Sequence, residues 1–288
     1  MKRALPMVFL ERMKHAPFPY EGEFVDTGEA FFDYVDSETG KRYHTNRHGD
    51  RFEEDRHYRD STVLFCIPPA FEPEEPFFYL VFFHGHGTTA AQSVTDYELI
   101  EQVVESKKNV VFIAPQLAVE ASDSSPGKFY QEGNFGLFMD EVARILSEKI
   151  GREHAGKFRI APIVLASFSG GYKSVAYILD RGGVSKRLRG VFLLDALYED
   201  LDKFQSWILK YIRETFFLLI YTEGSVEQNA KALAEFLDKN GIRLGRRWPA
   251  PSWKRGVFLI KSDADHFMVP LIGPPSRPLK QVLEGLRF

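Results

Sequence analysis

Hydrophobic and polar positions follow a regular alternation along most of this chain. From residue 62 onward, short unbroken apolar runs are separated by longer segments whose apolar residues recur at helical spacing. Unbroken runs of this length predict strands that are buried on both faces, and the segments between them predict covering helices. Strands are expected at 62–67, 77–83, 109–115, 159–167, 190–196, 216–222 and 256–262.

The segments between these runs predict helices with one apolar stripe each. In the segment 134–150, for example, Phe135, Phe138, Val142 and Leu146 share one face. The other helices are expected at 89–107, 169–180, 199–212 and 226–241, with a short helix closing the chain. Alternation of strand and helix predicts the α/β class, with a mostly parallel sheet covered by helices on both faces.

The first 60 residues have a different pattern. Residues 23–46 predict a hairpin, because an aromatic, β-prone run is followed by the turn sequence SETGK and a second short run. The segment 44–60 is rich in charge and histidine and is expected to be a solvated loop. The spacing of its histidines matches no zinc pattern, so no metal site is expected there. We find no linker, and we expect residues 1–60 to belong to the same domain as residues 61–288.

Composition excludes several classes of partner. Hydrophobic residues make up 44% of the chain, and the formal net charge is −3, so no basic excess suggests a nucleic acid or an anionic membrane as partner. No apolar run is long enough to span a membrane. The single cysteine, Cys66, lies in an apolar run and is expected to be a small buried side chain. The apolar stretch at 4–10 lacks a cleavage signal, so the cytoplasm is favoured over export.

The sequence SFSGG at 167–171 joins an expected strand to an expected helix. A nucleophile elbow needs a central residue on a strained turn, with small residues two positions before and after it, because the strand and helix backbones pass closely there. Here Ser169 is central, and the small neighbours are Ser167, where glycine is usual, and Gly171. The N–H of Gly170 would then lie at a helix N-terminus and face a developing oxyanion.

A second glycine-containing turn, HGHG at 84–87, follows the strand at 77–83. Backbone N–H groups of such a turn can approach a reacting carbonyl closely, and the N–H of His86 is the first choice as donor, with Gly87 as the alternative. No third ligand accompanies His84 and His86, so no metal site is expected here either.

The base and the acid are sought at the ends of later strands. His266 follows the last strand and is the only histidine after the elbow, so it is the expected base. Two carboxylates compete as its partner: Asp195 ends the strand after the elbow helix, and Glu223 ends the next strand. Asp195 is preferred because it follows an unbroken apolar run and would need a buried partner. The order Ser, acid, His along the chain fits either choice.

Together, HGHG at 84–87, SFSGG at 167–171 and DH at 265–266 resemble the α/β-hydrolase superfamily, in particular its serine esterase and lipase-like members. The resemblance covers about residues 60–288, which would be the catalytic domain. It implies a sheet of about eight strands, acyl transfer through an acyl-serine, a small-molecule ester as substrate, and no metal or organic cofactor.

The substrate is expected to contact the loop 116–133, which leaves the end of a strand beside the expected site. Phe129 and Tyr130 in this loop, with Tyr172 beyond the elbow, are candidate substrate-binding residues. Two other functions remain open: an amidase or peptidase with the same three catalytic groups, and a non-catalytic binding protein. The latter would separate Ser169 from His266.

Overall fold

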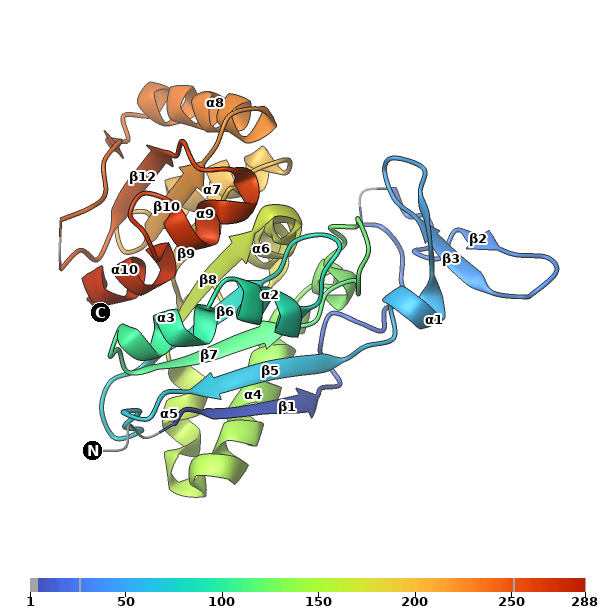
Figure 1. The fold of residues 1–288 in the computed structure, drawn as a ribbon, viewed down its shortest axis with the longest axis horizontal. Helices are drawn as coiled ribbons and strands as arrows, with labels where there is room; N and C mark the ends of the chain where they lie inside the picture. Colours follow the sequence, from blue (N-terminus) through green and yellow to red (C-terminus); the bar gives the residue numbers. More distant parts are fainter. Residues whose placement is uncertain (1–4, 26, 251, 288) are drawn as a thin grey trace.

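The central element is a nine-stranded sheet, which confirms the predicted α/β class (Figure 1). The computed structural model describes residues 5–25, 27–250 and 252–287. The strands lie in the order β1-β5-β7-β6-β8-β9-β10-β12-β11, and only β5 runs opposite to the others, so it pairs antiparallel with both β1 and β7. Their bounds are β1 Met7–Arg12, β5 Thr62–Ile67, β6 Phe78–Phe83, β7 Val110–Pro115, β8 Ile163–Phe168, β9 Leu188–Leu194, β10 Phe216–Tyr221, β11 Leu244–Gly245 and β12 Gly256–Lys261.

All seven expected strands are present, and β1 and β11 bring the total above the expected eight. The edge strand β1 lies in the first 60 residues, before the expected hairpin, where no strand was expected, and it pairs with β5 along its whole length. Its side chains are mostly exposed or half-buried, which is why its pattern lacks the unbroken apolar run of a central strand.

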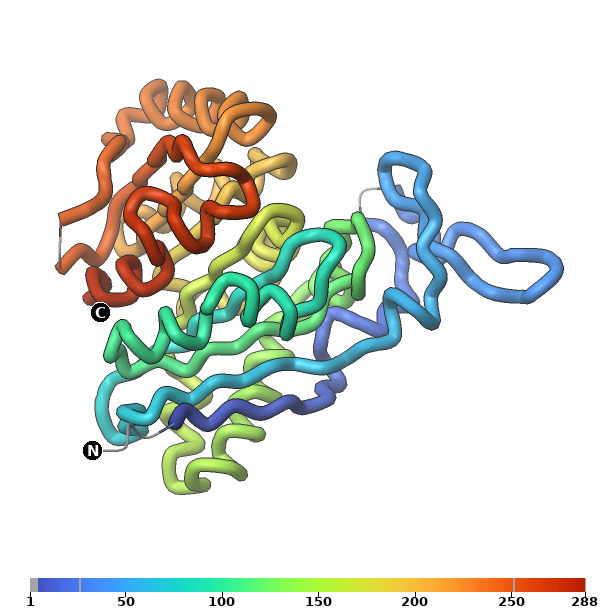
Figure 2. The backbone as a smooth tube through the Cα atoms, viewed as in Figure 1, coloured from blue at the N-terminus to red at the C-terminus, as the bar shows by residue number. Residues whose placement is uncertain are grey.

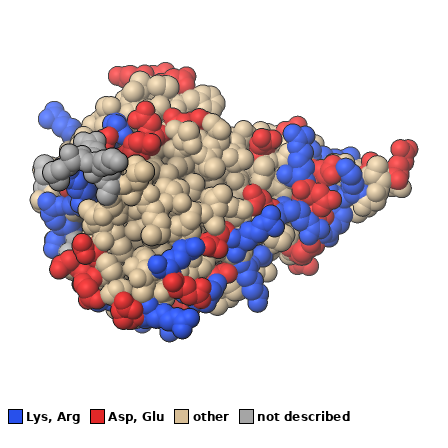
Figure 3. Space-filling view, turned by 60° about the horizontal axis from the view of Figure 1, so that its bottom comes forward, with Lys and Arg blue, Asp and Glu red and all other residues tan. Residues whose placement is uncertain are grey.

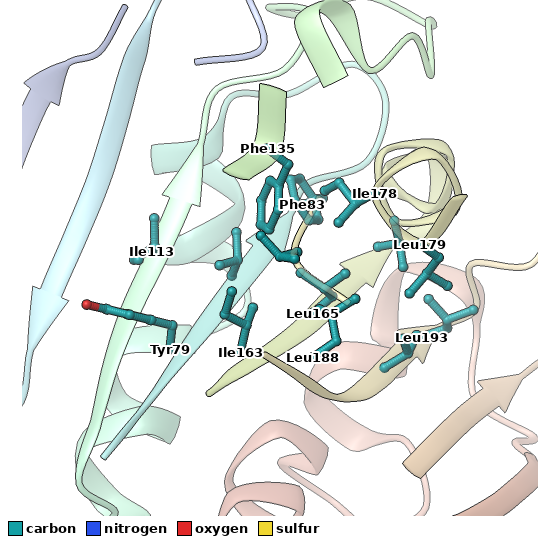
Figure 4. Packing of buried hydrophobic residues seen from close by; sticks show 14 of the residues in the cluster. Tyr79, Phe83, Ile113, Phe135, Ile163, Leu165, Ile178, Leu179, Leu188 and Leu193 are labelled. Atoms are coloured by element: carbon teal, nitrogen blue, oxygen red, sulfur yellow. The ribbon is translucent and has the colours of Figure 1, made fainter. Parts of the chain in front are cut away.

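Alternate residues of the central strands enter two separate cores, one on each face of the sheet. Tyr79, Ile163, Leu165 and Leu193 belong to the first core and pack together with side chains of the covering helices (Figure 4). Their chain neighbours, such as Val164, point into the second core. The period of two in a strand therefore explains why these runs are apolar at every position.

Five helices supply the first core, and four others supply the second. The first group is α4 Asn134–Ile150, α5 Ala155–Ile160, α6 Tyr172–Arg181, α7 Leu201–Tyr211 and α8 Ser225–Lys239; the second is α2 Ala90–Asp96, α3 Leu99–Glu105, α9 Val269–Ile272 and α10 Pro278–Gly285. The single helix expected at 89–107 was wrong. Glu98 has a left-handed backbone conformation with φ of 49°, which ends one helix and begins the next.

The segment between β1 and β5, residues 14–60, projects from the molecule at the end opposite both termini (Figures 1 and 2). We call it the lobe. It contains an antiparallel sheet of β2 Tyr34–Val35, β3 Arg42–Thr45 and β4 Arg51–Glu53, followed by the helix α1 Glu54–His57. The expected hairpin is thus present as β2–β3, and β4 extends it. Lys and Arg side chains mix with Asp and Glu over its surface (Figure 3).

The expectation of a solvated loop at 44–60 was wrong, because two of its histidines are buried. The ring of His44 stacks on Phe31 at 4.2 Å and donates a hydrogen bond through Nδ1 to the Phe31 carbonyl. His57 likewise donates to the carbonyl of Val119. A histidine ring packs well against aromatic neighbours once its N–H has an acceptor, and the aromatic residues of the lobe provide such neighbours.

His44 also faces the buried carboxylate of Asp123, which belongs to the loop 116–133. The distance from His44 Nε2 to Asp123 Oδ1 is 3.6 Å, and Asp123 also accepts hydrogen bonds from Tyr58 and Ser125. Burial alone would lower the pKa of His44, but the carboxylate of Asp123 raises it overall. Burial would raise the pKa of Asp123, but the hydrogen bond and charge of His44 lower it overall. The pair fixes the lobe to the body of the protein.

Replacing His44 with Gln should lower the free energy of unfolding by about 3 kcal/mol, because the Asp123 carboxylate would stay buried without its cation. The comparison is by urea denaturation, with the exposed His48→Gln as the control. The contribution of His44 to the free energy of unfolding is fully present below pH 6.5, the ordinary histidine pKa. It is lost as the pH rises through the raised pKa of His44. The contribution of Asp123 to the free energy of unfolding is fully present above pH 3.8, the ordinary aspartate pKa. It is lost as the pH falls through the lowered pKa of Asp123. A His44→Gln difference that stayed constant above neutral pH would contradict the charged pair.

Candidate functional site

The carboxyl ends of the parallel strands carry the predicted site residues. Ser169 follows β8 directly, and its φ of 50° is a left-handed conformation that non-glycine residues rarely adopt. Gly171 comes next to the backbone of β6: a Cβ there would lie 2.4 Å from the carbonyl oxygen of Phe83. Glycine at 171 is therefore required by the close passage of α6 over β6, as the elbow hypothesis expects.

Ser167 occupies the place where glycine was expected two residues before Ser169. It lies inside β8, opposite Phe83 in β6 and Leu193 in β9. Its side chain is fully buried, and its hydroxyl has no hydrogen-bond partner among the described residues. A serine thus fits the space at the end of β8, but its hydroxyl does not reach the site.

Ser169, His266 and Asp195 form a continuous chain of hydrogen bonds. Ser169 Oγ lies 2.9 Å from His266 Nε2, and His266 Nδ1 lies 2.6 Å from Asp195 Oδ2. With Nδ1 protonated toward the carboxylate, Nε2 offers its lone pair to the hydroxyl of Ser169. These three side chains come from the ends of β8, β12 and β9, so the parallel sheet brings together residues that are far apart in sequence.

Asp195 is almost completely buried, and protein groups satisfy its carboxylate. Oδ1 accepts a hydrogen bond from the backbone N–H of Thr222 at 2.8 Å, and Oδ2 accepts one from the Thr222 hydroxyl at 2.6 Å. These donors hold the carboxylate in place beside the imidazole. The alternative acid, Glu223, is 84% exposed and pairs with Lys261 instead, at 3.3 Å. Of the two candidate acids, the structure brings only Asp195 to His266.

His266 is positioned by its neighbours on the chain and by an aromatic ring. Asp265 accepts the backbone N–H of Phe267, which fixes the turn that begins at His266. The ring of Phe168 stacks against the imidazole at 4.8 Å, with an interplanar angle of 26°. Both contacts limit the orientations that the His266 imidazole can adopt.

The HGHG turn lies directly above the elbow. His84 is fully buried, and its Nε2 accepts hydrogen bonds from Gln116 and from the N–H of Leu117, so its proton resides on Nδ1, which donates to the Gly85 carbonyl. Burial lowers the pKa of His84 to about 4. Neutral His84 therefore supports the turn from below, and it has no contact with the Ser169 hydroxyl.

The two candidate oxyanion donors in this turn differ in their hydrogen bonding. The N–H of Gly87 donates to the carbonyl of Ala121 at 3.0 Å, so this alternative is already engaged. Within the described part of the chain no acceptor engages the N–H of His86 or that of Gly170. The side chain of His86 stands over Gly170, where a Cβ would lie 2.2 Å from its Cδ2. The geometry thus leaves the first choice, His86 with Gly170, available.

Tyr198 is a neighbour of the site that the sequence analysis missed. Its ring lies perpendicular to that of His266, with centroids 6.4 Å apart, and tilts against Tyr172 at 5.9 Å. Burial, followed by the negative charge of Asp195, raises the pKa of Tyr198 to about 12. Its position three residues beyond Asp195, just after the end of β9, was the available signal.

A pocket of about 300 Å³ opens beside the His86 side chain. The lobe forms one wall, the loop 122–125 forms another, and Tyr172 and Lys173 of α6 form a third. Tyr130 and Tyr172, both predicted to bind substrate, line this pocket. The same prediction for Phe129 was wrong: Phe129 is fully buried in the first core, because its apolar ring packs against Phe83 and Phe135.

Comparison with solved structures reveals chains of the same architecture at low sequence identity. A feruloyl esterase module from Clostridium thermocellum superposes with a TM-score of 0.51 at 12% identity, over 93% of this chain and 95% of that one. A ferulic acid esterase gives 0.53 at 9% identity, over 96% and 98%. The fluorophosphonate-binding serine hydrolase F of Staphylococcus aureus gives 0.50 at 11%, over 98% and 97%. This chain has the α/β-hydrolase fold.

No family model and no curated protein matches the sequence. In this α/β-hydrolase fold, the lobe is inserted between the first two strands of the sheet, β1 and β5, at the edge far from β12. No group of three or more His, Cys, Asp or Glu side chains in the described ranges is arranged to hold a metal ion. The described helices include none with the length and apolar character needed to cross a bilayer.

Replacing Gly171 with Ala should lower the free energy of unfolding by about 1–3 kcal/mol, because the new methyl group would force β6 and α6 apart. Gly156→Ala is the matched control: it lies in a helix with nothing within 4 Å of the added Cβ, and it should be neutral or up to about 1 kcal/mol more stable. Urea denaturation measures both. Equal stability of the two variants would contradict the close packing at the elbow.

Proposed function

We propose that this protein is a serine hydrolase that cleaves carboxylic esters through an acyl-serine intermediate. The observation that carries the proposal is the unbroken hydrogen-bond chain from Ser169 through His266 to buried Asp195. Serine hydroxyls in general do not meet an imidazole at 2.9 Å while standing on a strained turn, and this arrangement is the one that activates a nucleophile.

The proposed reaction begins when His266 Nε2 takes the proton of Ser169 as its Oγ attacks the ester carbonyl. The negative charge that develops on the carbonyl oxygen is stabilised by the N–H groups of His86 and Gly170. Collapse of the tetrahedral intermediate breaks the bond to the alcohol, which receives the proton from His266. Asp195 keeps the imidazole in the required tautomer and stabilises its charged form throughout.

The second half of the proposed reaction releases the acid. A water molecule gives its proton to His266 Nε2 and attacks the acyl carbonyl, and the same two N–H groups hold the oxyanion. Ser169 then leaves with the proton from His266, which restores the starting state. Every group required for these steps is supplied by the chain, so the proposal names no metal or organic cofactor.

Ester hydrolysis is the reaction favoured among those that this triad can perform. The structures with the same fold and TM-scores of at least 0.5 carry names that describe esterases and a serine hydrolase. A small-molecule ester is accordingly the proposed substrate class. Amides remain the second candidate substrates, because the same three groups also support amide cleavage. The contact between Ser169 and His266 argues against the binding-protein hypothesis.

Fluorophosphonate labelling should depend on Ser169 alone among the serines at the elbow. Ser169→Ala should abolish labelling, whereas Ser167→Ala should retain it, because the Ser167 hydroxyl is buried and has no contact with His266. Fluorescence in a denaturing gel measures both variants, and circular dichroism confirms that each is folded. Labelling that persists in Ser169→Ala would refute the assignment of the nucleophile.

Substitution of the two candidate acids should have very different effects. Asp195→Asn should lower kcat for a 4-nitrophenyl ester by about 10³–10⁴, because the amide favours the wrong imidazole tautomer. Glu223→Gln changes an exposed side chain and should alter kcat by less than about twofold. Steady-state assays of both variants settle the assignment. A large loss in Glu223→Gln with little loss in Asp195→Asn would reverse it.

A further inference from the structure

The pocket beside His86 contains several charged side chains, and most of them are already paired. Arg47 of the lobe forms an ion pair with Glu199, which also accepts a hydrogen bond from the Tyr172 hydroxyl at 2.9 Å. Asp123 is paired with His44, as described above. These groups build the wall of the pocket, and their charges are balanced within the protein.

Lys173 is the exception among the cations of the pocket. It lies at the start of α6, four residues after Ser169, and it is half-buried. No carboxylate lies within ion-pair distance of its ammonium group among the described residues, and no hydrogen bond to it is found there. The one carboxylate of the lining that also lacks an ion pair, Glu29, is exposed to solvent at the rim. The ammonium group of this half-buried lysine is therefore available to form a charge-assisted hydrogen bond with an anion in the pocket.

The pocket lies next to the proposed reaction centre. The His86 side chain lines the pocket and also stands over Gly170, the residue after the nucleophile. Tyr172 lines it as well, and its ring contacts Tyr198, which lies beside Ser169. A group attached to the reacting ester can therefore extend into the pocket while the carbonyl lies at Ser169.

We propose that this pocket receives an anionic group of the substrate, a carboxylate or a phosphate, and that Lys173 is its counter-ion. The proposal rests on the proposed ester hydrolysis and adds the substrate class. A volume of about 300 Å³ is at the lower limit of ligand pockets, so the bound group is small. The polar side chains of Ser122, Ser124 and Asn46 line the remaining space and suit a group that forms hydrogen bonds.

The lobe determines which cation is available to the substrate. Arg47 would be a second counter-ion, but Glu199 neutralises it and fixes its position. Lys173 on the rigid helix α6 is left as the group that selects for charge. Specificity would then arise from one flexible ammonium group, which accepts either a planar carboxylate or a tetrahedral phosphate.

The test uses matched esters that differ in one charge. On the acyl side, the mono-4-nitrophenyl ester of glutaric acid is compared with 4-nitrophenyl pentanoate. On the alcohol side, 4-acetoxybenzoate is compared with its methyl ester, and 4-acetoxyphenyl phosphate tests the phosphate arm. The readout is the ratio of kcat/KM for the acidic ester to that for its neutral partner.

In the wild type, we expect at least one acidic ester to be preferred. Lys173→Met should lower that ratio by about tenfold, Lys173→Glu should lower it further, and Lys173→Arg should preserve most of it. Lys186→Met, which removes an exposed lysine outside the pocket, should leave the ratio unchanged. Added salt should reduce the ratio in the wild type more than in Lys173→Met.

The test distinguishes a failure of the Lys173 proposal from a failure of the proposed hydrolase function. If the wild type cleaves the neutral esters without preferring any acidic partner, or if the preference survives in Lys173→Met, the role of Lys173 is refuted and the proposed hydrolase function stands. If no ester is cleaved and fluorophosphonate does not label Ser169, the proposed function fails, and the substrate class fails with it.

Discussion

The close contact between the backbone of β6 and the first turn of α6 is the constraint on which the site depends. Gly171 permits this contact, since any side chain there would collide with the carbonyl of Phe83. The contact forces the chain through a tight turn and leaves Ser169 with its left-handed backbone. It also places the HGHG turn, which continues directly from β6, above the elbow. A single packing requirement thus positions the Ser169 hydroxyl and the candidate N–H donors of His86 and Gly170.

The sheet supplies the rest of the site through its parallel order. β8, β9, β10 and β12 are consecutive strands of the sheet, so their carboxyl ends lie side by side. The side chains of Asp195 and His266 meet beyond these strand ends. Thr222, at the end of β10, donates two hydrogen bonds to the Asp195 carboxylate. The buried carboxylate of Asp195 is therefore stabilised by β10, the strand that lies between β9 and β12.

The sequence was sufficient for the fold class and for the seven buried strands, and it proposed the candidate site residues, because these depend on local patterns. Unbroken apolar runs mark buried strands, and small residues around Ser169 mark a turn with no space for side chains. Placement of Asp195 at the end of a buried run favoured it over Glu223 for a physical reason, namely that a buried carboxylate needs partners. The catalytic roles of these residues stay predictions until the substitutions above are made.

The features that could not be predicted depend on contacts between distant segments. The burial of His44 requires Asp123 from another loop, and the break at Glu98 has no glycine or proline to mark it. Nothing in the local sequence marks Tyr198 as a neighbour of His266 or Lys173 as a lining residue of the pocket, because these positions depend on how distant segments pack. Phe129 and Tyr130 are adjacent in sequence, aromatic and both buried, yet Phe129 packs in the first core, whereas Tyr130 packs among the aromatic residues of the lobe and lines the pocket.

The pairing of β1 with β5 has a consequence for how such a protein can change over evolution. The two strands are in register from Met7 with Ile67 to Arg12 with Thr62, so the lobe departs from and returns to two adjacent points at the edge of the sheet. Insertions or deletions at the tip of the lobe therefore need not alter the register of β1 with β5 or the positions of Ser169 and His266. The lobe wall of the pocket can therefore diversify in sequence and length, while Lys173 and Ser169 stay together at the start of α6.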